Sequence, residues 1–214
     1  MPLHTSDALI LRTYALGESD RIVVFLTRDR GKKRGVAKNA RQSRRRFGGA
    51  LEPLTCGRIT YRERERRDLV FVQDMAPTRS PLTAADGEAL SYVGYFAELI
   101  DECSPENDPS EPMFRLGTSL VEAIAVGVAI ESLARYFEFW LLRLQGVYRD
   151  DPRLSAGARR FLSAARSCTP SALGSVPVSA AVLRELERVH QLQIAMHLEK
   201  DLKSTKVLRE IRRT

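Results

Sequence analysis

Short apolar runs separated by polar turns fill the first third of the chain and predict β-strands. The clearest run is IVVFLT at 22–27, which is β-branched and aromatic and is followed by turn residues at 29–31. Residues 38–50 lack a hydrophobic period and contain two adjacent glycines, so they predict a loop. Further runs predict strands at 8–11, 32–37, 56–61 and 69–72. About five short strands joined by turns are typical of a small closed barrel.

After the last of these strands the apolar positions recur at helical spacing. Residues 131–146 place Phe137 and Trp140 on one face and end at Gly146, which is the expected C-cap. Ser179 stands where the N-cap of a later helix is expected. The same spacing predicts helices at 84–103, 113–126, 156–168, 179–198 and 204–212.

The positive charge of the chain is concentrated in its first third. The whole chain carries a formal net charge of +7. Residues 1–80 hold 18 Lys and Arg against 9 Asp and Glu, whereas the remainder holds 16 against 18. Such asymmetry is typical of a nucleic-acid-binding or membrane-surface module joined to a second part of the chain. We therefore predict an α+β fold, with an N-terminal OB-fold β-barrel in residues 1–80 followed by an all-α helical domain in residues 82–214.

The densest basic cluster runs from Arg28 to Arg46 and contains one acidic residue, Asp29. So many like charges repel one another unless solvent or a polyanion neutralises them, and arginine binds phosphate oxygens bidentately. A solvated surface loop is the alternative interpretation. The ring of Phe47 would either stack on a base or anchor the loop to the barrel. The candidate DNA-binding residues are Arg28, Lys32, Lys33, Arg34, Lys38, Arg41, Arg44, Arg45, Arg46 and Phe47.

Four other aromatic residues lie beside this cluster. Phe25 and Phe71 stand in apolar strands, so we expect both in the barrel core. Tyr14 and Tyr61 lie in the same basic region, where aromatic rings can stack on bases without regard to sequence.

No arrangement of residues typical of an enzyme stands out. The three histidines pair with no nucleophile, and the chain has no P-loop motif. The three cysteines are far apart and form no C-x-x-C pair, so neither a disulfide framework nor a zinc site is expected. We predict a protein that is not an enzyme and needs no metal and no cofactor.

Several segments, taken in order, carry a shared pattern. They are GESDRIV at 17–23, LTR at 26–28 with Gly31, GVAK at 35–38, FGGALEP at 47–53, FEFWLL at 137–142 leading to Gly146, and HLEKDLKS at 197–204. Together they resemble the RecO family, whose N-terminal domain shows a similar strand pair, turn and basic loop closing in F-G-x-x-L-x-P.

Two features of the sequence depart from the family pattern. The family usually has glycine after the Ala-Lys pair, where this chain has Asn39, a residue that tolerates the left-handed conformation. Many relatives also carry a four-cysteine zinc module after the F-E-x-x-L-L helix. The corresponding stretch here, VYRDDPRLSAGARRFLSAARSC, holds one cysteine, so we predict that the zinc module is absent.

The resemblance implies a recombination mediator in homologous recombination and DNA repair. Such proteins bind single- and double-stranded DNA and anneal complementary strands. They work with RecR and the single-stranded DNA-binding protein to load RecA, which is an indirect partner. The N-terminus has no apolar signal-peptide core, and charge interrupts every apolar stretch well short of ~18 residues, so we expect a cytoplasmic, nucleoid-associated protein with no membrane partner.

The resemblance also implies that the helical domain docks the acidic C-terminal tail of the single-stranded DNA-binding protein. A tail that is acidic and ends in an apolar residue needs an apolar pocket with a cationic rim. The rim candidates are Arg115, Arg135 and Arg143, whereas Trp140 and its apolar neighbours are expected in the core.

Three alternative functions remain at this stage. The first is an RNA-binding OB-fold protein. The second is a metal-dependent nuclease, which the lack of clustered acids and histidines disfavours. The third is a peripheral membrane protein, which is disfavoured because the basic cluster falls in strands and a loop rather than on an amphipathic helix.

Overall fold

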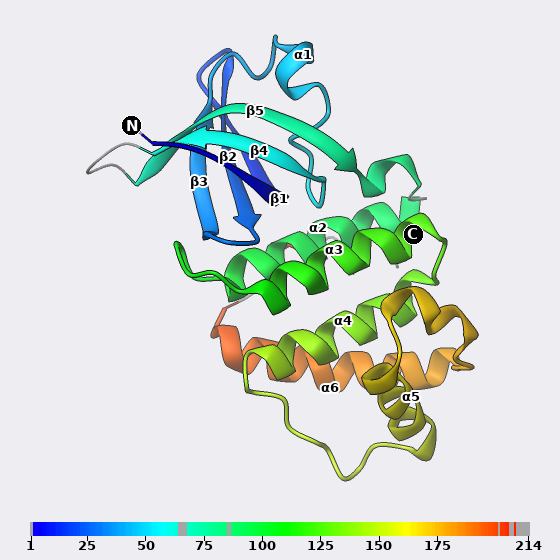
Figure 1. Cartoon of the computed structure of the whole chain (residues 1–214). Helices are drawn as coiled ribbons and strands as arrows, with labels where there is room; N and C mark the ends of the chain where they lie inside the picture. The colour runs from blue at the N-terminus through cyan, green and yellow to red at the C-terminus, as the bar shows by residue number, and fades with distance from the viewer. Residues whose placement is uncertain (1, 64–67, 85–86, 201, 206–207, 209–214) are drawn as a thin grey trace.

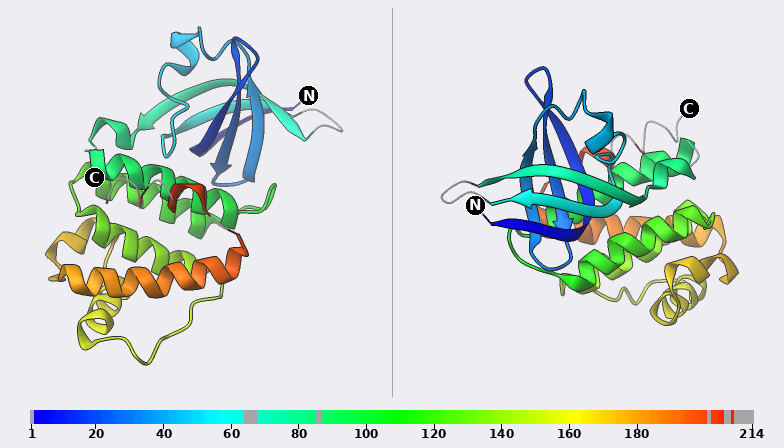
Figure 2. Two further views of the ribbon diagram at one scale, coloured as in Figure 1. Left: turned by 180° about the vertical axis from the view of Figure 1, so that it is seen from behind. Right: turned by 45° about the horizontal axis from the view of Figure 1, so that its top comes forward.

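A computed structural model describes residues 2–63, 68–84, 87–200, 202–205 and 208. Figure 1 shows a barrel stacked on layers of helices, and the views in Figure 2 show the same arrangement from behind and from above. Helices α2 and α3 lie directly against the barrel, and α4 and α6 form the next layer (Figure 1). Among the described residues, no helix is both long and apolar enough to span a bilayer.

The barrel is closed by five strands in the order β1-β2-β3-β5-β4. Strands β3 and β5 pair in parallel, and the other neighbouring pairs are antiparallel. This closed five-strand arrangement is that of an OB-fold. The strands are β1 (Leu3–Leu16), β2 (Asp20–Thr27), β3 (Gly31–Ala37), β4 (Cys56–Arg62) and β5 (Leu69–Arg79).

Two strands are longer than the apolar runs that predicted them. Strand β1 pairs with β4 through its first half and with β2 through its second half, with an irregularity between Ile10 and Arg12. A strand that closes a barrel must have hydrogen-bonded neighbours on both sides, so polar residues join it as well. Strand β5 likewise continues to Arg79, seven residues past the end of the predicted strand at 72.

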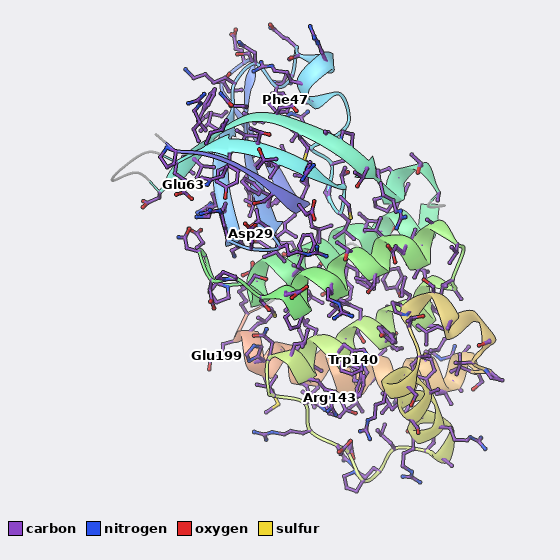
Figure 3. All side chains as sticks on the ribbon, viewed as in Figure 1. Asp29, Phe47, Glu63, Trp140, Arg143 and Glu199 are labelled. Carbon is purple, nitrogen blue, oxygen red and sulfur yellow. The ribbon has the colours of Figure 1, made fainter. Side chains whose placement is uncertain are left out.

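The predicted loop at 38–50 contains a short helix, α1 (Arg44–Phe47). Asn39 begins the loop with φ 54°, which confirms that asparagine supports the left-handed turn. Its backbone N–H donates to Asp20 Oδ1 at 2.8 Å, and the N–H of Arg41 donates to the carbonyl of Ser19 at 3.1 Å. The loop is therefore fastened to the β1–β2 turn. Figure 3 shows Phe47 at this end of the barrel.

The helices begin and end at residues suited to those positions. Ser110, Ser155 and Ser179 each accept a hydrogen bond from a backbone N–H in the first turn of their helix. The C-cap of α4 is Gln145, one residue before the expected Gly146, and Gly146 follows it in the left-handed conformation with φ 70°. The helices are α2 (Gly87–Cys103), α3 (Glu111–Ala125), α4 (Ile130–Leu144), α5 (Ala156–Ser167) and α6 (Ala180–Leu198), with 3-10 turns η1 (Pro81–Thr83) and η2 (Pro170–Ser175).

The predicted last helix, 204–212, lies largely outside the described residues, although 203–205 and 208 are helical. This segment is held to α2 by Glu98, which accepts the backbone N–H groups of Lys203 at 3.1 Å and of Ser204 at 2.8 Å. Burial alone would raise the pKa of Glu98, but these hydrogen bonds and the nearby Arg12 outweigh it, so the pKa is lowered. The ionised carboxylate therefore fixes the C-terminal segment on α2.

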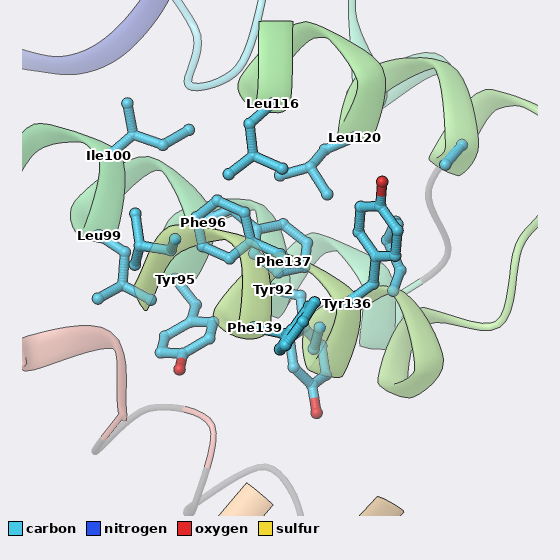
Figure 4. Packing of buried hydrophobic residues seen from close by; sticks show 14 of the residues in the cluster. Tyr92, Tyr95, Phe96, Leu99, Ile100, Leu116, Leu120, Tyr136, Phe137 and Phe139 are labelled. Carbon is cyan, nitrogen blue, oxygen red and sulfur yellow. The ribbon is translucent and has the colours of Figure 1, made fainter. Parts of the chain in front are cut away.

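The largest hydrophobic core lies between the barrel and the helices. It includes outward-facing barrel residues such as Leu9, Val24 and Leu26 together with residues of every helix from α2 to α6. Figure 4 shows its centre, where the rings of Phe96 and Phe137 meet edge to face with centroids 5.0 Å apart. A second, smaller core fills the barrel itself. The barrel and helices are therefore fixed relative to each other by shared apolar packing.

Candidate nucleic-acid interface

The predicted basic cluster does not form one surface. Arg28, Lys32 and Arg34 lie at or beside the end of β3 that faces the helices, whereas Lys38 and Arg41 follow its other end. A strand rises ~3.3 Å per residue, so Lys38 lies about 20 Å along the strand from Lys32 and about 13 Å from Arg34. Figure 1 shows α1 at the barrel end opposite the helices.

Two lysines of the cluster are used inside the molecule, which corrects their assignment to DNA. Lys32 Nζ lies 3.0 Å from Asp101 Oδ1 on α2 and also donates to the Asp101 carbonyl. Lys33 Nζ donates to Glu63 Oε1 at 2.8 Å. Both lysine side chains are only 13% exposed. The Lys33 hydrogen bond lowers the pKa of Glu63 despite its partial burial, which favours the ionised carboxylate.

Two arginines near the helices are also engaged, but on the surface. Arg28 Nη1 lies 3.6 Å from Asp7 Oδ2, and its guanidinium stands 5.5 Å from the ring centre of Phe114. Arg34 Nη1 lies 3.7 Å from Glu106 Oε1. Exposed ion pairs of this kind contribute little to stability, so both guanidiniums can exchange partners.

The loop that follows β3 carries three further exposed cations of the cluster. Lys38, Arg41 and Arg45 are exposed, and the three are hereafter called the basic turn. The loop backbone is ordered by its own arginines, because Arg41 Nη1 donates to the Glu18 carbonyl and Arg46 Nη2 donates to the Lys38 carbonyl. The side chain of Arg44 lies outside what the structure describes. The basic turn is therefore a preformed cationic surface.

Phe47 anchors this loop instead of presenting its ring to a base, which corrects the stacking assignment. Its side chain is 3% exposed and packs in the inner barrel core with Ala50 and Leu51. Arg46 covers it, with the guanidinium 5.0 Å from the ring centre. A ring that is buried in the core cannot stack on a base, so the anchoring interpretation is the one the structure supports.

Of the two strand aromatics expected in the barrel core, one lies there and the other does not. Phe25 is fully buried in the inner core, as expected. Phe71 belongs to neither core and is partly exposed, because its neighbours Val70 and Val72 take the inward positions. The expectation that Phe71 is a core residue is therefore wrong.

A groove in the helical region is lined by one of the three rim candidates. Its volume is ≈ 690 Å³, and its walls come from α3, α4 and η2 together with Arg28 of the barrel. Arg115 lines it and is exposed. Its apolar surface comes from Leu116, Tyr136, Trp140, Leu144 and Pro170. Sequence reasoning placed Arg28 in the DNA-binding cluster, and no local signal connects it with a groove formed by residues 111–171.

The other two rim candidates lie elsewhere. Arg135 is 2% exposed and its Nη2 lies 3.0 Å from Glu138 Oε1 in the core, so its assignment to a rim is corrected. Arg143 is exposed and lies over the rings of Phe139 and Trp140, at 5.5 and 5.7 Å from their centres. It is not one of the residues that line the groove.

The described residues contain no group of three or more His, Cys, Asp and Glu side chains that could hold a metal ion. Burial raises the pKa of both Cys56 and Cys103 to about 12. Both side chains are therefore protonated thiols near neutral pH, whereas the nucleophile and the metal ligand is the thiolate. The predicted lack of a zinc module stays a prediction.

The closed barrel, its basic turn and the helices packed against it place the protein in the class of OB-fold proteins with a helical extension. Residues 1–81 match the family model described as "Recombination protein O N terminal". Residues 84–150 match the model described as "Recombination protein O C terminal". The chain belongs to the recombination protein O (RecO) family, and the predicted α+β fold is confirmed.

Three relatives illustrate the similarity, and each bears the name "DNA repair protein RecO". The protein of Koribacter versatilis (strain Ellin345) is 41% identical over 149 residues, which cover 69% of this chain and 61% of that relative. The protein of Anaeromyxobacter sp. (strain K) is 34% identical over 197 residues, covering 85% and 76%. The protein of Syntrophus aciditrophicus (strain SB) is 28% identical over 250 residues, covering 98% and 96%. The match thus spans less than two thirds of the first relative's length.

Proposed function

We propose that the protein is a DNA-binding recombination mediator that acts in homologous recombination and DNA repair. It binds single- and double-stranded DNA, promotes annealing of complementary strands, and helps to load RecA, together with RecR, on DNA coated with the single-stranded DNA-binding protein. The observation that carries the proposal is the basic turn, Lys38, Arg41 and Arg45, on an OB-fold barrel of this family. An RNA-binding OB-fold protein is the alternative.

The mechanism is electrostatic and involves no bond making or breaking. The basic turn contacts phosphate oxygens, and the released counterions supply the free energy of binding. When two complementary strands approach, the cations reduce the repulsion between their backbones, so base pairing can begin. The fold of the loop around Arg46 and Phe47 holds the cations in place before DNA arrives, which limits the entropy lost on binding.

The purified protein is expected to accelerate annealing of complementary strands coated with the cognate single-stranded DNA-binding protein. The rate enhancement should fall as salt rises, because screening weakens the phosphate contacts. Annealing is measured by quenching between a fluorophore and a quencher on opposite strands. A protein that binds DNA yet leaves the annealing rate at its spontaneous value contradicts the proposal. Preference for RNA over single-stranded DNA of equal length in competition would favour the alternative.

We further propose that the groove beside Arg115 docks the acidic C-terminal tail of the single-stranded DNA-binding protein. Trp140 and Leu144 offer an apolar surface for the terminal side chain, and Arg115 and Arg28 offer cations for the carboxylates. Of the acids that line the groove, Glu122 is already paired, because Arg79 Nη1 lies 2.7 Å from its Oε1. The groove therefore combines the two features that an acidic peptide with an apolar end requires.

Replacing Arg115 by alanine is expected to weaken binding of a labelled tail peptide to the full chain by about tenfold, the value of one charge-assisted hydrogen bond. The matched control is Arg160→Ala, which removes the same charge from an exposed position on α5. Fluorescence anisotropy measures both affinities at low and moderate salt. Equal affinities for the two variants would remove Arg115, and with it this groove, from the docking site.

A further inference from the structure

A row of side chains runs obliquely across the outside of the barrel, from one strand to its hydrogen-bonded neighbour. Each member stands opposite the next on a neighbouring strand, so their side chains share the outer face. The row, hereafter the outer row, runs through Tyr14, Ile22, Val36, Phe71, Arg62 and Leu3.

The residues next to the outer row along each strand show which way its side chains point. Val23 and Val72 lie in the inner barrel core, so their neighbours Ile22 and Phe71 must point outward. Gly35 also points inward, because a Cβ added to it would stand 2.7 Å from side-chain carbons of β5. The outer row therefore consists of five apolar residues and one arginine on the exterior of a β-barrel.

The apolar members of the outer row are left exposed. Tyr14 is 39% exposed and Leu3 is 52% exposed, and the three between them are partly exposed. None of the five belongs to either hydrophobic core. Single exposed apolar residues are ordinary, but neighbours in one continuous row form a patch of the kind that marks a binding surface.

The outer row lies just beyond the area that the helices cover. Leu26 and Lys32 on the same outer face are covered by the helical layer. Arg12 and Arg34 come next, both opposite Val24, and they reach carboxylates of Asp101 and Glu106 at the edge of that layer. The outer row follows two residues further along each strand, on the side of the basic turn. It is therefore placed between two sets of cations.

The charges around the outer row point to an anionic partner with flat apolar parts. Arg12 Nη1 donates to the Tyr14 hydroxyl at 3.0 Å, and its guanidinium stands 5.9 Å from the ring centre, which orients the ring. Arg62 stands directly opposite Phe71 in the row, and Arg34 precedes Val36 by two residues. Unpaired nucleotides combine flat apolar bases with phosphates, so they satisfy both features at once.

We propose that the outer row is a stacking platform for the unpaired bases of single-stranded DNA, with Tyr14 and Phe71 as its two stacking rings. The proposal rests on the DNA binding proposed above and adds where the bases go. Neighbouring strands lie ~4.8 Å apart, so the two rings, three strand steps from each other, are about 14 Å apart. One strand that covers the ~4–16 nucleotides of an OB-fold site reaches both.

In this arrangement the outer row and the basic turn bind different parts of the DNA. Bases in a duplex are already stacked on one another, so the outer row accepts only unpaired bases. The basic turn contacts phosphates, which both single and double strands provide. The outer row is therefore the element that makes the protein prefer single strands.

The test compares variants of the full chain that keep or remove the rings. The double variant Tyr14→Ala with Phe71→Ala is expected to lose affinity for an oligothymidylate longer than ~16 nucleotides by about 25-fold or more, and each single variant by about fivefold or more. Affinity for duplex DNA and the salt slope for either ligand should stay as in the unchanged protein. Tyr14→Phe and Phe71→Tyr should retain binding, whereas Phe71→Leu, which keeps an apolar side chain without a ring, should not.

Each outcome has a definite meaning once unfolding curves show that the variants are folded. If the unchanged protein does not bind the oligothymidylate, the proposed DNA-binding function fails. If it binds but the double variant binds equally well, the stacking platform is wrong while the function stands. Full binding by Phe71→Leu, or an equal loss for duplex DNA, would also overturn the platform. A change in sedimentation without a change in DNA affinity would identify the outer row as a protein interface instead.

Discussion

Replacing Lys38, Arg41 and Arg45 together by alanine is expected to weaken binding of single-stranded DNA by on the order of 100-fold at 0.1 M salt. Each phosphate contact lowers the slope of log K against log salt by ~0.7 on single strands, so losing three should flatten that slope by about 2. Because phosphates carry no sequence information, the loss should be the same for all base compositions. Fluorescence anisotropy across a salt series measures both quantities.

The matched control removes the same charge elsewhere. Arg160 on α5 and Arg184 and Arg188 on α6 are exposed, so their triple alanine variant has the same net charge as the basic-turn variant. If the affinity for DNA depends only on the net charge of the protein, the two variants will lose the same affinity, and the basic turn is not the DNA-binding site. A normal slope in the basic-turn variant would lead to the same conclusion.

The structure restricts this test to residues that are free to contact DNA. Lys32 and Lys33 stand in the middle of the same basic cluster, yet their ammonium groups are bonded to Asp101 and Glu63. Replacing Lys32 would disturb the contact between the barrel and α2, and replacing Lys33 would remove an ion pair within the barrel, so neither variant would report on DNA alone. The density of basic residues along the sequence identified the region. Which cations are available to DNA depends on their partners, which lie 69 residues from Lys32 and 30 residues from Lys33.

The sequence predicted the barrel and the helices because their hydrophobic periods are local. It underestimated β1 and β5, whose added residues are set by pairing with distant strands and not by their own apolar content. The orientation of the side chains in the run LVFV at 69–72 could not be predicted either. The apolar residues of this run are consecutive, so the period alone does not reveal that Val70 and Val72 face inward and Phe71 outward.

The candidate sites show the same division between local and long-range information. The basic turn was found from composition, and the left-handed Asn39 that begins its loop was expected from residue type. Arg135 could not be excluded from a rim by sequence, because its burial depends on residues of α2 and α6 that are distant in the sequence. The outer row was hidden for the same reason, since its members come from five separate strands.

Loss of Glu138 is expected to destabilise the helical region strongly. It is fully buried on α4, and it accepts a hydrogen bond from the Tyr95 hydroxyl at 2.7 Å. Arg135 Nη2 lies 3.0 Å from one of its oxygens and His190 Nδ1 lies 3.1 Å from the other. One carboxylate thus joins α2, α4 and α6.

The electrostatics of this cluster depend on the carboxylate. Burial alone would lower the pKa of the Arg135 guanidinium, but Glu138 and Glu187 outweigh it and raise the pKa above its ordinary value. Burial also raises the pKa of Tyr95 well above its usual range, so its hydroxyl stays protonated and donates to Glu138. Without Glu138, a buried guanidinium would lose its closest counter-charge.

Glu138→Ala is therefore expected to lower the free energy of unfolding by about 3–5 kcal/mol, the usual cost of removing one partner from a buried ion pair. Tyr95→Phe removes a single hydrogen bond and should cost about 1–2 kcal/mol. The control is Arg143→Ala, an exposed position on the same helix, which should cost little. Urea unfolding followed by circular dichroism measures all three.

The same variants connect the core with the docking groove. Trp140 follows Glu138 by two residues on α4, and its indole Nε1–H donates to the Ala165 carbonyl at 3.0 Å while the side chain lines the groove. The Glu138→Ala variant, in which α4 is loosened, should therefore bind the tail peptide more weakly. Its affinity for DNA should stay unchanged, because the basic turn lies at the far end of the barrel. An unfolding free energy within ~1 kcal/mol of the unchanged protein would show that the surrounding helices hold α4 without this carboxylate.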